Sequence, residues 1–150
     1  MCIRDRYLRL LAGVVDWTRW RCFAYCLMGN HLHLLVQTPE PNLGDGMRRL
    51  HGGYALLYNR RHGKVGHVFQ GRFGSSLIRD DDQMWTVVRY IARNPVEAGL
   101  CREPHEWRWS SYRATLDGTG PTWLDRLRLL ERFGAMGGDP RTTYRSLVDG

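Results

Sequence analysis

Two strand-length apolar runs separated by a two-residue turn signal constrain the fold of this chain most. The first run is Cys22–Met28, the second is His31–Gln37, and Gly29-Asn30 lies between them. A Gly-Asn pair between two such runs is typical of a tight β-hairpin. The sequence therefore predicts an antiparallel hairpin at this position.

Helical periodicity and a bent apolar segment surround this hairpin. Apolar residues at helical spacing predict helices over Tyr7–Trp17 and Leu43–Arg60. The acidic run 80–82 predicts the start of a further helix, which Asn94-Pro95 is expected to end. Val68–Ile78 is expected to form a bent strand or two short strands.

The order of these elements mixes a hairpin with helices and lacks a regular βαβ alternation. This order favours an α+β fold with an antiparallel sheet. We divide the chain into a main domain over residues 1–114 and a helical C-terminal extension over residues 115–150. Short helices are predicted in that extension at Leu124–Phe133 and Tyr144–Val148.

The charge of the chain bears on its partners. The net charge is +7, and Lys64 is the only lysine, so arginine supplies nearly all of the positive charge. Such a balance favours a polyanion such as nucleic acid, although a basic protein from an arginine-rich proteome would look the same. The four cysteines lack zinc-site spacing, and no apolar run is long enough to cross a membrane. We therefore expect a cytoplasmic protein with reduced thiols.

Two histidines alternate in the second run of the hairpin. Alternate side chains of a strand point to the same face, so His31 and His33 are expected to project together. Two adjacent imidazoles suit a divalent metal ion. Two half-buried histidines bonded to backbone groups are the alternative, and the pattern alone leaves both open. Histidine-triad hydrolases need a third histidine where this chain has Leu35, which counts against that class.

Tyr90 and Asn94 are four residues apart on the predicted helix, so their side chains lie on one side of it. Asn94 offers a carbonyl oxygen to a metal ion, and Tyr90 offers a phenol to whatever that ion binds. A rim aromatic residue and a helix C-cap are the alternative interpretation. Residue spacing by itself does not exclude it.

Four blocks of the sequence together resemble one protein family. They are CLMGNHLHLLVQTP, YNRRHGKVGHVFQGRF, VVRYIARNPVEAGL and WRWSSY. In this order and spacing they closely resemble the REP-associated tyrosine transposases, which belong to the IS200-like single-tyrosine HUH transposases. The resemblance implies a ferredoxin-like antiparallel sheet with helices on one face. The opening MCIRDR does not have the character of the family's first strand, so we expect that strand to be absent.

The resemblance also implies a role for each site residue. His31, His33 and Asn94 would hold Mg²⁺ or Mn²⁺, and Tyr90 would be the catalytic nucleophile. The implied substrate is single-stranded DNA with a short palindromic, REP-like hairpin, cleaved and rejoined through a covalent 5′-phosphotyrosine.

Basic and polar side chains cluster in and around the segment after the second predicted helix. Phe69 and Phe73 lie nearby and can stack on bases. A solvated loop is the alternative to a DNA-binding surface. The residues predicted to bind DNA are Arg48, Arg49, Arg60, Arg61, Lys64, His67, Gln70 and Arg72.

Three functions stay open on the sequence alone. The first is a DNA-cleaving and rejoining transposase. The second is a ferredoxin-like nucleic-acid-binding domain that never cleaves, and the third is a metal-dependent single-strand nuclease that uses water. Tyr54 and Tyr58 are rival nucleophiles, but neither has a ligand candidate one turn further on. The sequence does not distinguish a monomer from a homodimer.

Overall fold

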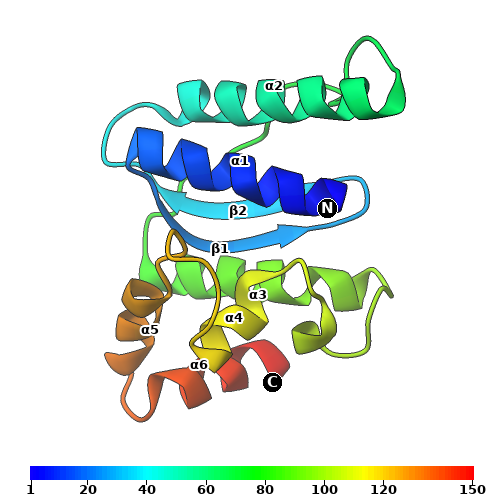
Figure 1. Cartoon of the computed structure of the whole chain (residues 1–150). Coiled ribbons are helices and arrows are strands. Elements are labelled where there is room, and N and C mark those ends of the chain that lie inside the picture. Colours follow the sequence, from blue (N-terminus) through cyan, green and yellow to red (C-terminus); the bar gives the residue numbers. More distant parts are fainter. The chain divides into compact units, whose positions relative to one another are not determined.

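A computed structural model describes all 150 residues, Met1–Gly150, and shows an α+β fold, as predicted (Figure 1). Its single sheet has two antiparallel strands. No helix is both long and apolar enough to span a bilayer. In chain order the elements are α1 (Ile3–Thr18), β1 (Arg21–Leu27), β2 (Leu32–Gln37), α2 (Leu43–His62), α3 (Asp81–Glu97), the 3₁₀ turn η1 (Pro104–Glu106), α4 (Ser111–Asp117), α5 (Arg126–Gly134) and α6 (Pro140–Asp149).

The chain divides into two compact units. Met1–Trp20 and Thr38–Leu77 form the helical unit, which contains α1, α2 and the loop that follows α2. Arg21–Gln37 and Ile78–Gly150 form the hairpin unit, which contains the sheet and α3 to α6. The domain boundary at residue 114 stays a prediction.

The hairpin unit begins with the predicted β-hairpin, which the structure confirms. β1 pairs with β2 so that Cys26 lies opposite His33. At the turn, the Met28 backbone N–H donates to the His31 carbonyl at 2.9 Å. This register fixes His31 at the turn end of the hairpin.

The outer edge of β1 is covered by a distant segment of the same unit. The Leu27 N–H donates to the Trp109 carbonyl at 2.9 Å. The Ser111 hydroxyl accepts from the Tyr25 N–H at 2.9 Å and donates to the Tyr25 carbonyl at 3.2 Å. Because these groups bond the β1 backbone, that edge of the two-stranded sheet is not left open.

Helix α3 packs against both the sheet and the C-terminal helix α6 of the hairpin unit. Its N-terminus is capped as predicted, because the Asp80 carboxylate accepts from the Gln83 N–H at 2.8 Å. Val88 and Ile91 lie on its buried face, and Phe133 of α5 and Val148 of α6 belong to the same core. The expected C-terminal helices are therefore present and packed on α3.

In the helical unit, α1 packs on α2 through aromatic side chains. The Tyr7 ring contacts Tyr54 edge-on at 5.3 Å, and its hydroxyl lies 3.2 Å from His51 Nε2. At the start of α2, Gly46 lies directly against the indole of Trp20, where a Cβ atom would clash. The indole Nε1 donates to Asn42 at 2.7 Å, which holds the ring in that position.

Two sequence-based expectations about local structure are wrong. Pro95 does not end α3, which continues to Glu97; Pro95 is buried, and only one helical hydrogen bond is lost at a proline near the C-terminus. Val68–Ile78 contains no strand, because no strand of the helical unit is available to pair with it. Most of the opening MCIRDR belongs to α1, which begins at Ile3.

Candidate active site

The structure brings together four of the predicted residues within the hairpin unit. His31 and His33 come from the turn end of the hairpin, and their rings lie 5.0 Å apart. The His33 ring lies 5.1 Å from Tyr90 of α3, edge to face. His31 Nε2 lies 3.2 Å from Asn94 Oδ1, one turn further along α3.

Strand alternation explains why α3 lies over the two histidines. Leu35 has the same parity as His31 and His33 and is buried in the core that contains Val88 of α3. Packing of Leu35 against that core draws α3 onto this face of β2. Tyr90 is 54% exposed, so its hydroxyl remains accessible to a substrate.

The environment of His33 keeps its imidazole neutral. Burial lowers the pKa of His33, and the nearby His31 lowers it further. His33 Nε2 is buried and has no hydrogen-bond partner. An orphaned buried nitrogen costs about 1–3 kcal/mol, and a bound ligand at this nitrogen would remove that cost.

Asn30 is a site residue that the sequence-based reasoning treated only as part of the turn. Its Oδ1 atom lies 2.7 Å from His31 Nδ1. Both ring nitrogens of His31 thus face amide oxygens, Nδ1 that of Asn30 and Nε2 that of Asn94, and these two contacts fix the orientation of the ring. Only the folded turn places the two side chains together, so a Gly-Asn turn signal could not indicate this role.

The side chains here form an incomplete ligand set for a metal ion. Nowhere in the chain do three or more His, Cys, Asp or Glu side chains form a cluster that could hold a metal ion. The candidate set is instead two imidazole nitrogens and one amide oxygen, from His31, His33 and Asn94. Such a set fits a divalent cation that takes its remaining ligands from water or from a phosphate.

Comparison with known proteins decides the family. A family model described as "Transposase IS200 like" matches residues 2–94, which include every predicted site residue. The chain belongs to the IS200-like transposase family. Over 100 residues it is 29% identical to a protein of Haemophilus influenzae that is named as a REP-associated tyrosine transposase. The match covers 59% of this chain and 57% of that relative, and no solved structure gives a significant match.

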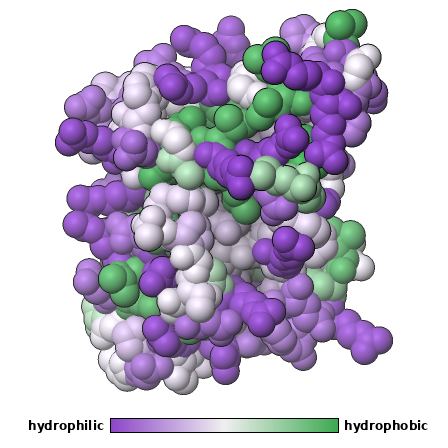
Figure 2. All heavy atoms as spheres, viewed as in Figure 1, coloured by the Kyte–Doolittle hydropathy of each residue, from purple (hydrophilic) through white to green (hydrophobic).

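The match to the IS200-like transposases also covers the residues predicted to bind DNA, most of which are basic. All eight residues predicted to bind DNA are exposed, and all belong to the helical unit. Arg48, Arg49, Arg60 and Arg61 lie on α2, and the other four follow in the loop after it. Figure 2 shows hydrophilic side chains along α2 and this loop, with hydrophobic side chains among them.

Several of these basic side chains already have contacts within the helical unit. Arg49 lies over the exposed Trp17 ring at 4.8 Å, and Lys64 lies over Tyr58 at 5.9 Å. The loop is held on α2 by Phe69, which stacks on His51 at 4.0 Å. These contacts place cations beside aromatic faces, an arrangement that suits single-stranded nucleic acid.

Tyr54, a rival nucleophile, lies in a less suitable environment than Tyr90. It is surrounded by the rings of Tyr7, Tyr58 and Phe69. Burial raises the pKa of Tyr54, and the neighbouring Tyr58 raises it further. A phenol with a raised pKa forms the attacking phenolate less readily, which disfavours Tyr54.

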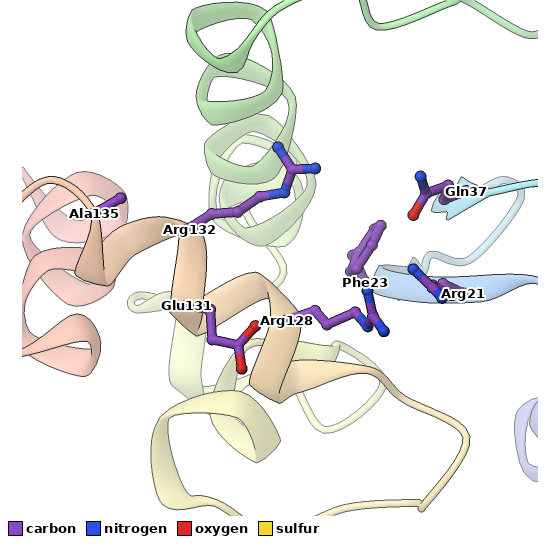
Figure 3. Close-up of a pocket in the computed structure, with 7 residues that line it drawn as sticks. All are labelled: Arg21, Phe23, Gln37, Arg128, Glu131, Arg132 and Ala135. Carbon is purple, nitrogen blue, oxygen red and sulfur yellow. The ribbon is translucent and has the colours of Figure 1, made fainter.

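A hollow of about 410 Å³ lies at the other end of the hairpin, lined by Arg21, Arg128 and Arg132 among others (Figure 3). Arg132 pairs with Asp81 at 2.9 Å, and Arg128 pairs with Asp125 at 3.4 Å. Because carboxylates already pair with two of the three guanidinium groups, this hollow does not offer a strong anion site.

Proposed function

We propose that this chain cleaves and rejoins single-stranded DNA near short palindromic, REP-like hairpins through a covalent 5′-phosphotyrosine. One observation carries the proposal: the rings of His31, His33 and Tyr90 and the amide of Asn94 lie together at one end of the hairpin unit. A domain that only binds nucleic acid has no need of this combination. Membership of the IS200-like transposase family supports the same reaction class.

Tyr90 is the proposed nucleophile. Its Oη atom forms a bond to the scissile phosphorus, and the bond from phosphorus to the 3′ oxygen breaks. The phenolic proton is lost in the process, and the departing 3′ oxygen ends as a hydroxyl group. Because the phosphotyrosine retains a phosphoester bond, the same 3′ hydroxyl, or another one, can attack it and rejoin the strand. Helix α3 holds Tyr90 on a packed scaffold, which favours a fixed angle of attack.

His31, His33 and Asn94 are the proposed ligands of Mg²⁺ or Mn²⁺. The neutral state of His33 and its orphaned Nε2 support this assignment, because a ligating imidazole must carry a lone pair. When bound, such a cation polarises the scissile phosphate and assists deprotonation of a phenol whose ordinary pKa is about 10. Asn30 orients His31 for this task through its contact with Nδ1.

The basic side chains of the helical unit are the proposed DNA-binding surface. Their positive charge would attract the phosphate backbone from a distance, and the neighbouring aromatic rings would stack on unpaired bases. Arg60, Arg61 and Arg72 are the exposed cations that we expect to contribute most, since no acidic side chain forms an ion pair with them.

Incubation with single-stranded hairpin DNA and Mg²⁺, followed by a denaturing gel, tests the proposal. We expect a covalent protein–DNA adduct that disappears in Tyr90→Phe. Cleavage without an adduct, retained by Tyr90→Phe, would identify a nuclease that uses water. Binding with neither cleavage nor adduct would identify a nucleic-acid-binding domain.

A further inference from the structure

A second hollow lies in the hairpin unit, just beyond the end of α3. It has a volume of about 640 Å³, within the range of about 300–1,000 Å³ that is usual for ligand pockets. The side chains that line it include Leu100, Arg102, Glu106, Trp107, Arg108 and Trp109. None of them belongs to the candidate active site.

Two tryptophan side chains that are partly exposed line this hollow. Trp107 and Trp109 are each only half-buried, and their rings meet edge-on at 5.5 Å. The Arg108 guanidinium lies 5.5 Å from the centre of the Trp109 ring. Partly exposed indoles with a neighbouring arginine are a combination that can hold unpaired bases, because every base has a π-face.

Glu106 makes the hollow more suitable for a base than for a phosphate. Its Oε2 atom accepts from the backbone N–H groups of Arg102 at 2.8 Å and Glu103 at 3.1 Å. These bonds lower the pKa of Glu106, so the carboxylate is ionised at neutral pH. A fixed carboxylate repels phosphate but accepts hydrogen bonds from the amino and imino groups of a base edge.

The hollow is tied to both elements of the candidate active site. Trp107 Nε1 donates to the Leu27 carbonyl at 3.0 Å, and the next residue, Met28, bonds the His31 carbonyl. Leu100 donates its N–H to the carbonyl of Pro95, the neighbour of Asn94. At a rise of about 1.5 Å per residue, the end of α3 lies roughly 5 Å from Asn94 along the helix axis.

We propose that this hollow binds one unpaired nucleobase of the single-stranded DNA substrate, a few nucleotides from the scissile phosphate. The inference rests on the proposed function and adds a base-binding subsite to it. Trp107 and Trp109 supply the stacking surface, and Glu106 supplies the acceptor for the base edge. The hollow lined by Arg128 and Arg132 lacks such a stacking pair, and its cations are paired with carboxylates.

Photo-crosslinking tests this subsite directly. A single-stranded hairpin oligonucleotide carries 5-iododeoxyuridine at one position at a time, is bound to the full chain in EDTA to prevent cleavage, and is irradiated. We expect one or two adjacent positions to crosslink to Trp107 or Trp109, as identified by peptide mass spectrometry. Crosslinks confined to other residues would overturn the inference.

An abasic-site scan gives a second readout, which compares two DNAs on one folded protein and therefore cancels a general loss of affinity. We expect an abasic site at the crosslinking position to weaken binding by the wild-type chain about five- to hundredfold. In Trp109→Leu this penalty should disappear, whereas Trp123→Leu should retain it. Trp123 is the matched control, a half-buried tryptophan of the same unit that packs on Tyr25 outside the hollow. An equal penalty in both variants would contradict the proposal.

The adduct assay run on the same wild-type protein separates the two proposals. Adduct formation without crosslinks at the hollow would contradict the base-binding subsite and would still support the proposed function. Crosslinks at the hollow without any adduct would support a base-binding pocket and would contradict the proposed cleavage through a phosphotyrosine. Absence of both would overturn both proposals.

Discussion

The two units of this chain differ sharply in charge. The helical unit has ten basic and four acidic side chains, a net charge of +6, whereas the hairpin unit has twelve basic and eleven acidic ones, a net charge of +1. All eight predicted DNA-binding residues belong to the first unit, and His31, His33, Tyr90 and Asn94 belong to the second. On the proposed assignment, long-range attraction and chemistry depend on separate parts of the sequence, and mutations should change one without the other.

The difference also concerns how the functional side chains are held. The candidate active site rests on a hairpin and a helix that share a core, with Leu35 and Val88 buried beneath it. The basic side chains are exposed on one helix and a loop. Covalent chemistry demands fixed geometry, while phosphate attraction tolerates mobile cations.

Tyr90→Phe should give the clearest separation of the proposed roles of the two units, because it should abolish the chemistry and leave DNA binding unchanged. The substitution keeps the ring beside His33 and removes only the hydroxyl that is the proposed nucleophile. We expect no detectable adduct on a denaturing gel and unchanged DNA affinity by fluorescence anisotropy. Tyr54→Phe and Tyr58→Phe are the controls and should form adduct; loss of adduct in Tyr54→Phe alone would move the nucleophile into the helical unit.

His31→Ala should also stop cleavage, but by a different cause. The variant loses one of three proposed ligands, so excess Mn²⁺ is expected to restore part of the cleavage through His33 and Asn94. No metal ion should rescue Tyr90→Phe. Gel assays across a Mn²⁺ titration measure this difference, and identical behaviour of the two variants would argue against a metal site.

Replacement of Arg60, Arg61 and Arg72 by alanine should weaken DNA binding and flatten its salt dependence. On single strands each lost phosphate contact lowers the log–log salt slope by about 0.7. Anisotropy titrations over a range of salt concentrations measure the slope. The matched control removes the same charge from the hairpin unit, through the exposed residues Arg113, Arg141 and Arg145. Equal slopes for both triple variants would contradict the proposed difference between the units in DNA binding.

Gly46→Ala should destabilise the helical unit by about 1–3 kcal/mol, because the new methyl group displaces the Trp20 indole. Hydrogen exchange should accelerate in α1 and α2. Gly52→Ala is the matched control on the same helix, since its Cβ meets nothing within 4 Å, and it should stabilise by about 0.5–1 kcal/mol. Similar urea midpoints for the two variants would contradict the observed packing.

The smallest expected effect is that of Arg132→Ala. Its ion pair with Asp81 has both side chains about half or more exposed, and such pairs contribute about 0–1 kcal/mol. Urea unfolding should show a loss in that range, with DNA affinity unchanged. A large loss of affinity would mean that the arginine-lined hollow of Figure 3 also binds DNA.

Local sequence patterns predict much of this fold and fail where a contact partner decides the structure. The Gly29-Asn30 turn, the α1 and α2 periodicity and the Asp80 cap are local signals, and the corresponding elements are present. Val68–Ile78 has strand-like composition, but a strand needs a neighbour, and Phe69 instead stacks on His51. Propensity alone carries no information about the absence of a partner strand.

The candidate site shows the same division. Alternation along β2 and the four-residue spacing on α3 predict which side chains share a face, and the structure brings His31, His33, Tyr90 and Asn94 together. The contact of Asn30 with His31 depends on the folded turn, and the hollow beside Trp107 depends on docking of a distant segment. The roles of these residues stay predictions that the assays above test.

The covered edge of β1 has a consequence for the order of folding. Tyr25 and Ser111 are 86 residues apart, so the bonds between them form only after a long loop has closed. Closing such a loop carries an entropic cost, and chains rich in distant contacts fold slowly. During synthesis we expect the outer edge of β1 to stay unpaired until the segment that contains Trp109 and Ser111 has left the ribosome. The outer edge of the hairpin is thus expected to be covered late, and until then the unpaired edge of β1 could pair with another chain.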